Sequence, residues 1–268
     1  MGAKNSGEGA IQVALMARES ISVCIIGMTP LILEAMSSKV RQDLLFPPQK
    51  QNRAAKASNL KHVPLDEFRR SAYRAQPHEN TQSRILFPAA AFGGAISGVA
   101  TDLPGVAKAQ MKRLAYVQGP ISGFYIELFG VPRMLMSVVR CADPARTPDI
   151  RTRAILPEWA CRLTIEYTKP LLNQQIVCNL LANAGIMRGV GGWRPERGGT
   201  FGQFAPTEPD NPEFLQILSE GGRDAQDAAF ASPEFFDSET AELSLWFDEE
   251  LLRRGMAPTE KTVQRKAA

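Results

Sequence analysis

Residues 189–204 read GVGGWRPERGGTFGQF and hold the residue types best suited to binding a polyanion. Glycine lets main-chain N–H groups approach an anion, arginine binds phosphates, and tryptophan offers a face on which a base can stack. We therefore predict a flexible loop that contacts phosphates and bases. Its predicted contact residues are Arg188, Gly189, Gly191, Gly192, Trp193, Arg194, Arg197, Gly198 and Gly199. The alternative is a β-turn with a cation–π pair and no ligand.

The spacing of these glycines does not match the loops that bind nucleotide cofactors. The sequence contains no G-x-x-x-x-G-K-[ST], and no G-x-G-x-x-G directly follows a strand and opens a helix. The glycines instead follow a predicted helix and precede a predicted strand. We therefore expect no cofactor.

A second arginine-rich segment, ARTPDIRTRA, spans residues 145–154. Arg151 and Arg153 would project to the same side of an extended chain, and Arg146 precedes them. These three side chains suit phosphates along a nucleic-acid strand. The alternative is an arginine loop neutralised by Asp149 and Glu158.

Residues 34–86 are polar and basic and show little periodicity, which predicts a long insertion, partly disordered or ordered by a ligand. Lys50, Arg53 and Lys56 could follow a phosphate backbone, with Tyr73 available to stack on a base. The alternative is a solvated loop without a ligand.

The net charge of +3 is unevenly distributed: residues 39–86 and 100–206 each carry +6, whereas residues 207–250 carry −12. This pattern predicts a polyanion binder with an acidic appendage, and the alternative is a set of solvated faces. We divide the chain into a flexible leader (1–18), a nucleic-acid-binding domain (19–206, with the insertion 34–86), and an acidic C-terminal extension (207–268) with one helix and a basic tail.

The extension has four open roles: recruiting a partner, folding back on the basic surface, docking on a neighbouring subunit, or completing the core with a helix. The aromatic residues that would dock are Phe214, Phe230, Phe235, Phe236 and Trp246.

Cysteine and histidine usage predicts neither disulfides nor a metal site. Cys24, Cys141, Cys161 and Cys178 lie in or beside apolar runs and read as buried free thiols of a reducing compartment. The two histidines, at positions 62 and 78, do not complete zinc-ligand spacing. With no signal-peptide pattern and no apolar run of about 20 residues, we expect a soluble, cytoplasmic protein without membrane contact.

The pattern of elements predicts an α+β fold with an RRM-like or ferredoxin-like core. The two core helices should pack on one face of an antiparallel sheet and leave the other face available. The predicted elements are a strand at 20–33 ended by Thr29-Pro30, a helix at 87–100, a hairpin of strands at 121–130 and 133–141, a strand at 158–169, a helix at 171–185 ended by Gly185, a short strand before Pro206, and a helix at 238–255.

Three motifs in chain order, IIGMTPLIL, FPAAAFGGAISG and AGIMRGVGGWRPERGGTFGQF, resemble the RAMP superfamily. These RRM-fold proteins include backbone subunits of CRISPR effector complexes. They carry a Ser/Thr-Pro turn after the first strand, a helix opened by a pattern like IPGSSLKGALR, and a glycine-rich loop after the last helix. The resemblance covers about residues 20–206. The chain departs from the pattern at Ala89-Ala90, where the family tends to Gly-Ser, and at Gly93, where lysine is common.

The resemblance, which extends to stand-alone proteins of this type from bacteriophages, implies that residues 189–202 form the loop that contacts RNA or DNA. It also implies that residues 87–94 form the start of the corresponding helix. The family's assemblies imply a homo-oligomer or a multi-subunit complex.

We therefore expect a non-catalytic, sequence-independent binder of single-stranded RNA or DNA that assembles as a filament or effector backbone. One alternative is a structural protein acting through protein contacts. Another is a metal-independent endoribonuclease that uses His62 or His78 with Tyr73 or Ser71.

Overall fold

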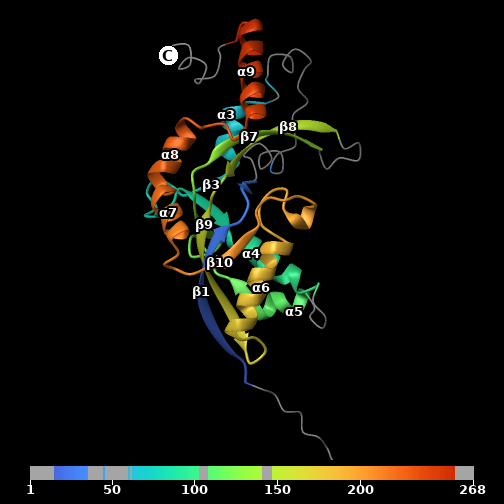
Figure 1. The fold of residues 1–268 in the computed structure, drawn as a ribbon, viewed down its shortest axis with the longest axis vertical. Helices are drawn as coiled ribbons and strands as arrows, with labels where there is room; N and C mark the ends of the chain where they lie inside the picture. The colour runs from blue at the N-terminus through green and yellow to red at the C-terminus, as the bar shows by residue number, and fades with distance from the viewer. Residues whose placement is uncertain are drawn as a thin grey trace, which may run out of the picture.

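The structure, a computed structural model, describes residues 15–35, 45, 60, 62–102, 108–140 and 147–256. Within these ranges the strands form two antiparallel sheets (Figure 1). The strands are β1 (Ala17–Gly27), β2 (Leu31–Ile32), β3 (Tyr73–Arg74), β4 (Ile85–Pro88), β5 (Ala115–Val117), β6 (Tyr125–Phe129), β7 (Arg133–Arg140), β8 (Pro148–Leu156), β9 (Ala160–Lys169) and β10 (Phe204–Thr207). The helices are α3 (Pro64–Arg70), α4 (Ala89–Val99), α5 (Lys108–Leu114), α6 (Gln174–Met187), α7 (Pro212–Glu220), α8 (Arg223–Ala231) and α9 (Ser238–Arg253).

The larger sheet has the strand order β10-β1-β9-β6-β4-β3, and β5 also pairs with β9. Its central strands and two helices follow one another in the chain as β1-α4-β6-β9-α6-β10, and the neighbouring strands are antiparallel. This is the βαββαβ ferredoxin-like arrangement with the RRM strand order. The fold class expected from the sequence is therefore confirmed.

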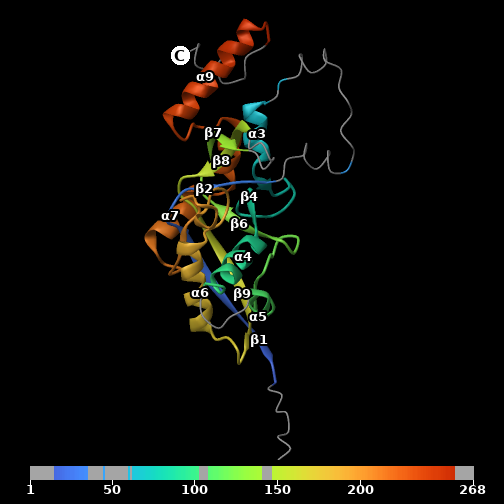
Figure 2. The same cartoon turned by 90° about the vertical axis from the view of Figure 1, so that its right-hand side faces the viewer.

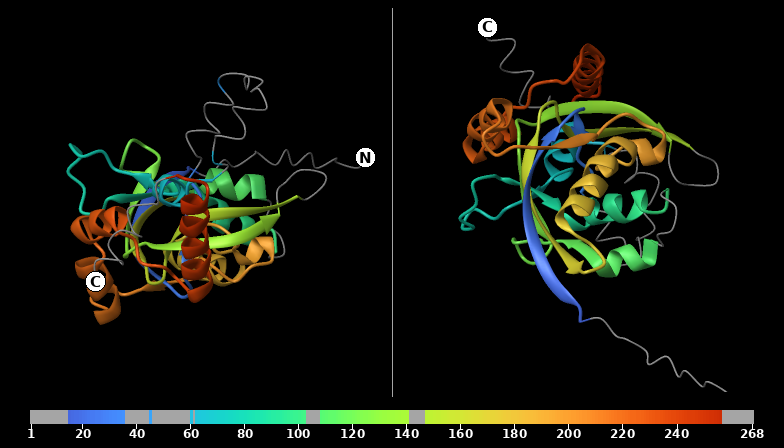
Figure 3. Two further views of the ribbon diagram at one scale, coloured as in Figure 1. Left: turned by 90° about the horizontal axis from the view of Figure 1, so that it is seen from above. Right: turned by 60° about the horizontal axis from the view of Figure 1, so that its bottom comes forward.

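Helices α4 and α6 pack on one face of this sheet, which curls around them (Figure 3). The alternating inward residues of β9 that the sequence predicted, Cys161, Leu163, Ile165 and Tyr167, are buried there. Helix α6 runs past Gly185, the expected stop, to Met187. A Cβ on Gly185 would overlap the carbonyl oxygen of Phe204 on β10. Gly185 thus serves the contact between helix and strand.

The expected hairpin of residues 121–130 and 133–141 is wrong. Strand β6 pairs with β4 and β9, whereas β7 pairs with β8 in the smaller sheet, whose order is β2-β8-β7. The N–H of Gly130 donates to the carbonyl of Gly221 (3.0 Å), and Pro132 has no N–H to donate. After Gly130 the chain therefore leaves the larger sheet and enters the smaller sheet as β7.

The second face of the larger sheet is not fully available, contrary to expectation. Helix α7 packs on it at the Gly27 end of β1, where Phe214 and Ile217 bury against Cys24, Phe129 and Ala160. Figure 1 shows α7 and α8 on the side of the sheet away from α4 and α6. The part near the Ala17 end of β1 carries polar and partly exposed residues.

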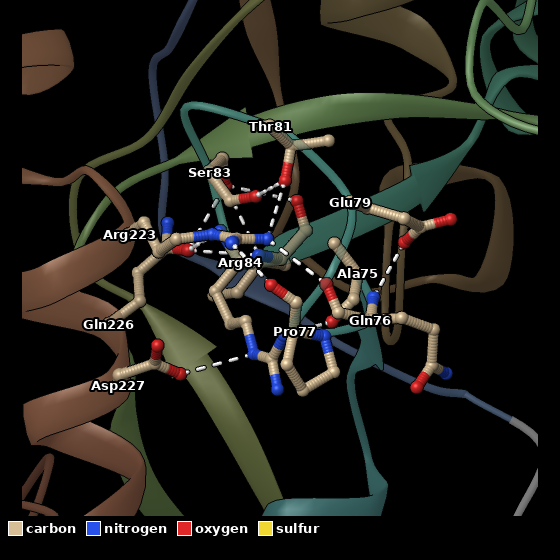
Figure 4. A network of polar contacts seen from close by, with 11 residues as sticks. Ala75, Gln76, Pro77, Glu79, Thr81, Ser83, Arg84, Arg223, Gln226 and Asp227 are labelled. Atoms are coloured by element: carbon tan, nitrogen blue, oxygen red, sulfur yellow. Dashed lines mark hydrogen bonds and ion pairs between the residues drawn. The ribbon is translucent and has the colours of Figure 1, made fainter.

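A buried glutamine holds α8 to the sheet. Gln226 is fully buried, and its side-chain oxygen accepts from Ser83 Oγ and from the main-chain N–H groups of Arg84 and Ile85. Its amide nitrogen donates to the carbonyl oxygens of Leu128, Gly130 and Gly221. Around it, Arg84 pairs with Asp227 (3.1 Å) and Arg223 donates to Thr81 (2.9 Å; Figure 4).

Over its described residues, 207–256, the C-terminal extension contains three helices, not one. Two of its aromatic residues, Phe214 and Phe230, lie in the hydrophobic core, so they complete the domain and do not dock elsewhere. Helix α9 begins on β7, where Thr240 Oγ1 accepts from the N–H of Met136 (3.1 Å), and then extends away from the sheets (Figure 2). The expected basic tail beyond residue 256 lies outside the described residues.

The region expected as an insertion with little structure is ordered over residues 62–86, where α3, β3 and the start of β4 form. The apolar side of α3 carries Phe68, which packs on Phe230 with 5.4 Å between ring centroids. Tertiary contacts with β8 and α8 therefore fix a segment whose own sequence shows little periodicity.

Cys24 and Cys161 are buried free thiols, as predicted, and burial raises the pKa of the Cys161 thiol above its ordinary value. Cys178 is only half-buried, and Cys141 lies outside the described residues. No helix in the described ranges is both long and apolar enough to cross a membrane.

Candidate nucleic-acid interface

The turn after β1 is fixed from two sides. The buried Trp159 donates its indole N–H to the carbonyl of Thr29 (2.9 Å), and the Thr29 hydroxyl accepts from the main-chain N–H of Gln203 (3.0 Å). Strand β1 ends at Gly27, just before Thr29-Pro30 as predicted. These two hydrogen bonds therefore hold the turn in one position.

The glycine loop, residues 188–203, lies directly on this turn. The N–H of Gly192 donates to the carbonyl of Ile32 (3.0 Å), and that of Gly202 donates to the carbonyl of Pro30 (2.8 Å). The loop also closes on itself, because the N–H of Val190 donates to the carbonyl of Gly202 (2.9 Å). Two of the motifs noted in the sequence are therefore in main-chain contact.

The sequence predicted a flexible loop whose main-chain N–H groups approach an anion. These contacts correct that expectation, because they hold the loop tightly. A Cβ on Gly202, which has a φ of +71°, would overlap the carbonyl oxygen of Val190. Five of the six glycine N–H groups of residues 189–204 already donate to main-chain carbonyls; they belong to Gly189, Gly192, Gly198, Gly199 and Gly202. Gly202 is thus required for close packing of the loop, and contact of this loop with nucleic acid stays a prediction.

Arg188 is committed to internal contacts. Its guanidinium pairs with Asp102 (2.7 Å) and Glu196 (3.3 Å) and donates to the carbonyl of Gly98 at the end of α4 (3.0 Å). Only 18% of its side chain is exposed. It joins α4 to the glycine loop and is poorly placed to bind a phosphate.

Arg194 and Arg197 are placed differently. Arg194 pairs with Glu196 (2.6 Å) and donates to the carbonyl of Gly191 (3.0 Å), which aims its side chain across the loop. Arg197 lies on the exposed 3₁₀ turn Pro195–Arg197, and its side chain has no partner within the described ranges. Of the three loop arginines, Arg197 is the most accessible to a ligand.

Trp193 combines exposure with an unusual backbone. Its side chain is 53% exposed, and its φ of +45° lies in the left-handed region that residues other than glycine rarely adopt. The loop holds this conformation through a hydrogen bond from the N–H of Phe201 to the carbonyl of Trp193 (3.2 Å). Left-handed backbone at a bulky residue is often found at ligand-binding sites.

The three motifs meet at one pocket of about 200 Å³. The chain after the first turn contributes Leu33 and Glu34, the glycine loop contributes Gly191 and Arg194, and the start of α4 contributes Ala91. The other lining residues are Ala35, Ser71, Tyr73, Leu86, Phe87 and Pro88. Segments far apart in the sequence thus build one small site with apolar walls and two charged side chains.

From Pro148 onward, the second arginine segment forms strand β8. Arg151 and Arg153 project to the same side, as an extended chain requires. Arg151 is half exposed and pairs with Asp149 (3.3 Å), in line with the neutralised alternative. Arg153 is largely covered and pairs with Glu34 at the pocket, not with Glu158. Arg146, Lys50, Arg53 and Lys56 lie outside the described residues.

His62 is held between two carboxylates. Its Nδ1 lies 2.6 Å from Glu67 Oε1, and its Nε2 lies 2.9 Å from Asp149 Oδ1, so both ring nitrogens are occupied. Ser71 is buried and donates its hydroxyl to the carbonyl of Phe68 (2.7 Å). Over the described ranges, no group of His, Cys, Asp and Glu side chains could hold a metal ion. This arrangement supports structure and offers no free base beside a nucleophile.

Sequence reasoning gave Glu34 no role, although it is the carboxylate of the pocket. The available signal was its position: it ends the apolar run LIL directly after the Thr-Pro turn. A charged residue there either faces solvent or faces the segments that pack on the turn. Its contact with Arg153, which is far away in the sequence, could not be read from the chain alone.

No protein-family model matches the sequence, and the comparison with curated proteins found no match. One similar solved structure is the cryo-EM structure of the type III-B Cmr-beta bound to cognate target RNA. It is 14% identical, with a TM-score of 0.34 and coverage of 71% of this chain and 59% of the other, so this chain spans about 59% of that relative's length. Another is the crystal structure of Cmr6 from Pyrococcus furiosus, 7% identical, with a TM-score of 0.35 and coverage of 72% of this chain and 100% of the other.

The ferredoxin-like fold of this chain follows from its own strand order, β10-β1-β9-β6.

Proposed function

We propose that this protein binds single-stranded nucleic acid without cutting it, at the pocket and along the glycine loop. The observation that supports this most is the convergence of the turn after β1, the start of α4 and the glycine loop on one site. That site combines aromatic and apolar walls with arginine, which is how proteins bind single strands: bases stack on aromatic rings and cations follow the phosphates.

Within this proposal the loop residues have distinct roles. Arg194 and Arg197 bind phosphates, and Trp193 stacks on a base. Arg188 contributes indirectly, because its pairs with Asp102 and Glu196 hold the loop in place. The glycines named above give the loop its tight path.

We propose that the protein does not cut the strand because His62 is not placed to act as a general base. A general base needs a ring nitrogen that can take a proton from a nucleophile, and both nitrogens of His62 lie against carboxylate oxygens. His78 is exposed on a turn between β3 and β4, and its side chain makes no polar contact within the described residues.

A fluorescence-anisotropy titration tests the proposal. The full chain is titrated with single-stranded RNA, single-stranded DNA and duplex DNA over a range of salt concentrations. We expect single strands to bind best and log K to fall with log salt. The double variant Arg194→Ala plus Arg197→Ala should weaken binding and reduce the salt slope by about 1.4, at ~0.7 per phosphate contact on single strands.

Arg254→Ala, which alters an exposed arginine on α9, serves as the matched control and should leave binding unchanged. Absence of binding at low salt, or binding that does not respond to salt, contradicts the proposal. Intact labelled RNA after prolonged incubation with the protein supports the non-catalytic part, and cleavage contradicts it.

A second candidate function, assembly through protein contacts, is favoured by α9. This helix exposes Leu245, Trp246 and Leu252, with Trp246 60% exposed. Removing everything after residue 206 would not test this role, because it would also remove Phe214 from the core. The sharper test is Leu245→Ser plus Trp246→Ser, followed by light scattering coupled to size exclusion. An unchanged mass excludes α9 as the assembly device.

A further inference from the structure

The pocket at the meeting point of the three motifs is small, and its size limits what it can hold. Its volume of about 200 Å³ is below the range of roughly 300–1,000 Å³ typical of pockets for drug-sized ligands. A whole nucleotide would exceed it, whereas one planar ring system would fill it. The phosphate and sugar of the same nucleotide would stay outside, on the side of Arg194.

The walls of the pocket suit an aromatic ring. Tyr73, Phe87 and Pro88 present flat or apolar surfaces, with Leu33 and Leu86 beside them. The ring of Tyr73 packs against that of Tyr125, with 5.2 Å between centroids. A ring held in this way loses little freedom when a base stacks on it, which favours binding.

Glu34 is the only carboxylate among the described residues that line the pocket, and Arg153 holds it in position. Arg153 binds Oε1 and also donates to Ser137 Oγ (3.2 Å), so the carboxylate is anchored from outside the pocket. Each carboxylate oxygen carries two lone pairs, so both oxygens keep acceptor capacity for a ligand. The Ser71 hydroxyl is already engaged, since it donates to Phe68 and accepts from the N–H of Ala154 (2.7 Å).

An ionised carboxylate accepts hydrogen bonds and cannot donate them. On the pairing edge of guanine, two donors stand side by side, the N1–H and the N2 amino group. Adenine and cytosine each place an acceptor next to their one amino group, and uracil places carbonyls on both sides of its N–H. Only guanine therefore offers Glu34 two adjacent donors without a facing acceptor.

We propose that this pocket takes up one unpaired base of the bound strand and prefers guanine, read by Glu34. The inference rests on the proposed function and adds to it, because the loop arginines supply affinity for any sequence whereas the pocket selects one base. Arg194, which also lines the pocket, supplies the positive charge for the adjoining phosphate.

The test measures anisotropy of the unchanged chain with short oligouridine RNAs that differ in one central base. We expect guanosine to bind about tenfold more tightly than adenosine, cytidine or uridine at that position, the usual effect of a paired hydrogen-bond contact to a base. Inosine keeps the N1–H and lacks the N2 amino group, so it should fall between guanosine and adenosine.

Glu34→Gln should abolish the difference between guanosine and adenosine, because it replaces one of the two carboxylate acceptors by an amide donor. Glu158→Gln, at an exposed position away from the pocket, is the matched control and should keep the preference. The base comparison uses the unchanged chain, so it decides the matter even if Glu34→Gln fails to fold.

Equal binding of all central bases, or preference for another base, overturns this inference and leaves the proposed function standing. Failure of every oligonucleotide to bind overturns the proposed function, and the guanine pocket with it.

Discussion

The main-chain N–H of Gly202 donates to the carbonyl of Pro30 across 2.8 Å. This bond joins the loop after the last core helix to the turn after the first strand, 172 residues earlier in the chain. A second bond, from the N–H of Gly192 to the carbonyl of Ile32 (3.0 Å), places Trp193 and Arg194 beside the end of β2. The position of the candidate interface thus depends on how tightly the glycine loop packs on that turn.

Gly202→Ala should destabilise the protein strongly. The substitution adds the cost of a left-handed backbone, about 1–2 kcal/mol, to an overlap of the new Cβ with the carbonyl oxygen of Val190. We expect a total loss of about 3 kcal/mol or more in the free energy of unfolding, measured by urea denaturation.

The matched control is Gly198→Ala. Gly198 has a similar φ of +78°, but no atom lies within 4 Å of the position that a Cβ would take, so only the backbone cost of about 1–2 kcal/mol should be observed. Equal losses for the two variants would show that the loop does not pack closely against itself.

Gln226→Leu should also cost about 3 kcal/mol or more of unfolding free energy. Leucine fills the space but leaves buried N–H and carbonyl groups of the sheet without partners, at about 1–3 kcal/mol for each unsatisfied group. Gln216→Leu, at an exposed position on α7, should change stability by less than about 0.5 kcal/mol. A small effect of Gln226→Leu would mean that water reaches this network.

The pKa of Glu250 on α9 is lowered from its ordinary 4.5 to about 2, first by hydrogen bonds from Arg253 and then by those from Arg254. A carboxyl group whose pKa is lowered by folding stabilises the folded state at pH values above its ordinary pKa. This stabilisation is lost as the pH falls toward the lowered pKa. The last turn of α9 should therefore loosen between about pH 4.5 and 2.

The measurement is an NMR titration of the Glu250 side-chain carboxyl. In the double variant Arg253→Ala plus Arg254→Ala, the pKa should return toward 4.5. A Glu250 that titrates near its ordinary value in the unchanged chain would show that these exposed ion pairs do not persist in solution.

Some of the fold could be predicted because local patterns determine it. The alternation along residues 158–169 predicted β9. The face of Leu172, Ile176, Leu180 and Ala184, widened by Val177 and Leu181, predicted helix α6 and most of its buried side, although Ile176 is 40% exposed. The cover on the second sheet face was missed although Phe214 and Ile217 stand three residues apart, as on one side of a helix. The strongly acidic composition around them had suggested a solvated segment.

The three segments of the candidate site could be recognised in the sequence, but their convergence on one pocket could not. The turn, the helix start and the loop each carried a readable motif, but their convergence depends on long-range pairing of β1 with β9 and β10. The explanation for the glycines was wrong for the same reason. Close contact between Gly202 and Val190 cannot be seen until the loop is folded on itself.

Trp193→Gly should weaken RNA binding and leave the free energy of unfolding nearly unchanged. Glycine adopts the φ of +45° without strain, and the tryptophan is 53% exposed, so the free energy of unfolding should change by less than about 1 kcal/mol. Binding of single-stranded RNA should weaken by about 1–3 kcal/mol, because a base loses the ring on which it stacks.

Anisotropy and urea denaturation are measured on the same samples. Trp193→Phe should restore most of the affinity, since a benzene ring still offers a stacking face, and Trp246→Ala on α9 should leave binding unchanged. If Trp193→Gly binds RNA as well as the unchanged chain does, the exposed tryptophan is not part of the interface. Binding would then rest on the arginines and the pocket alone.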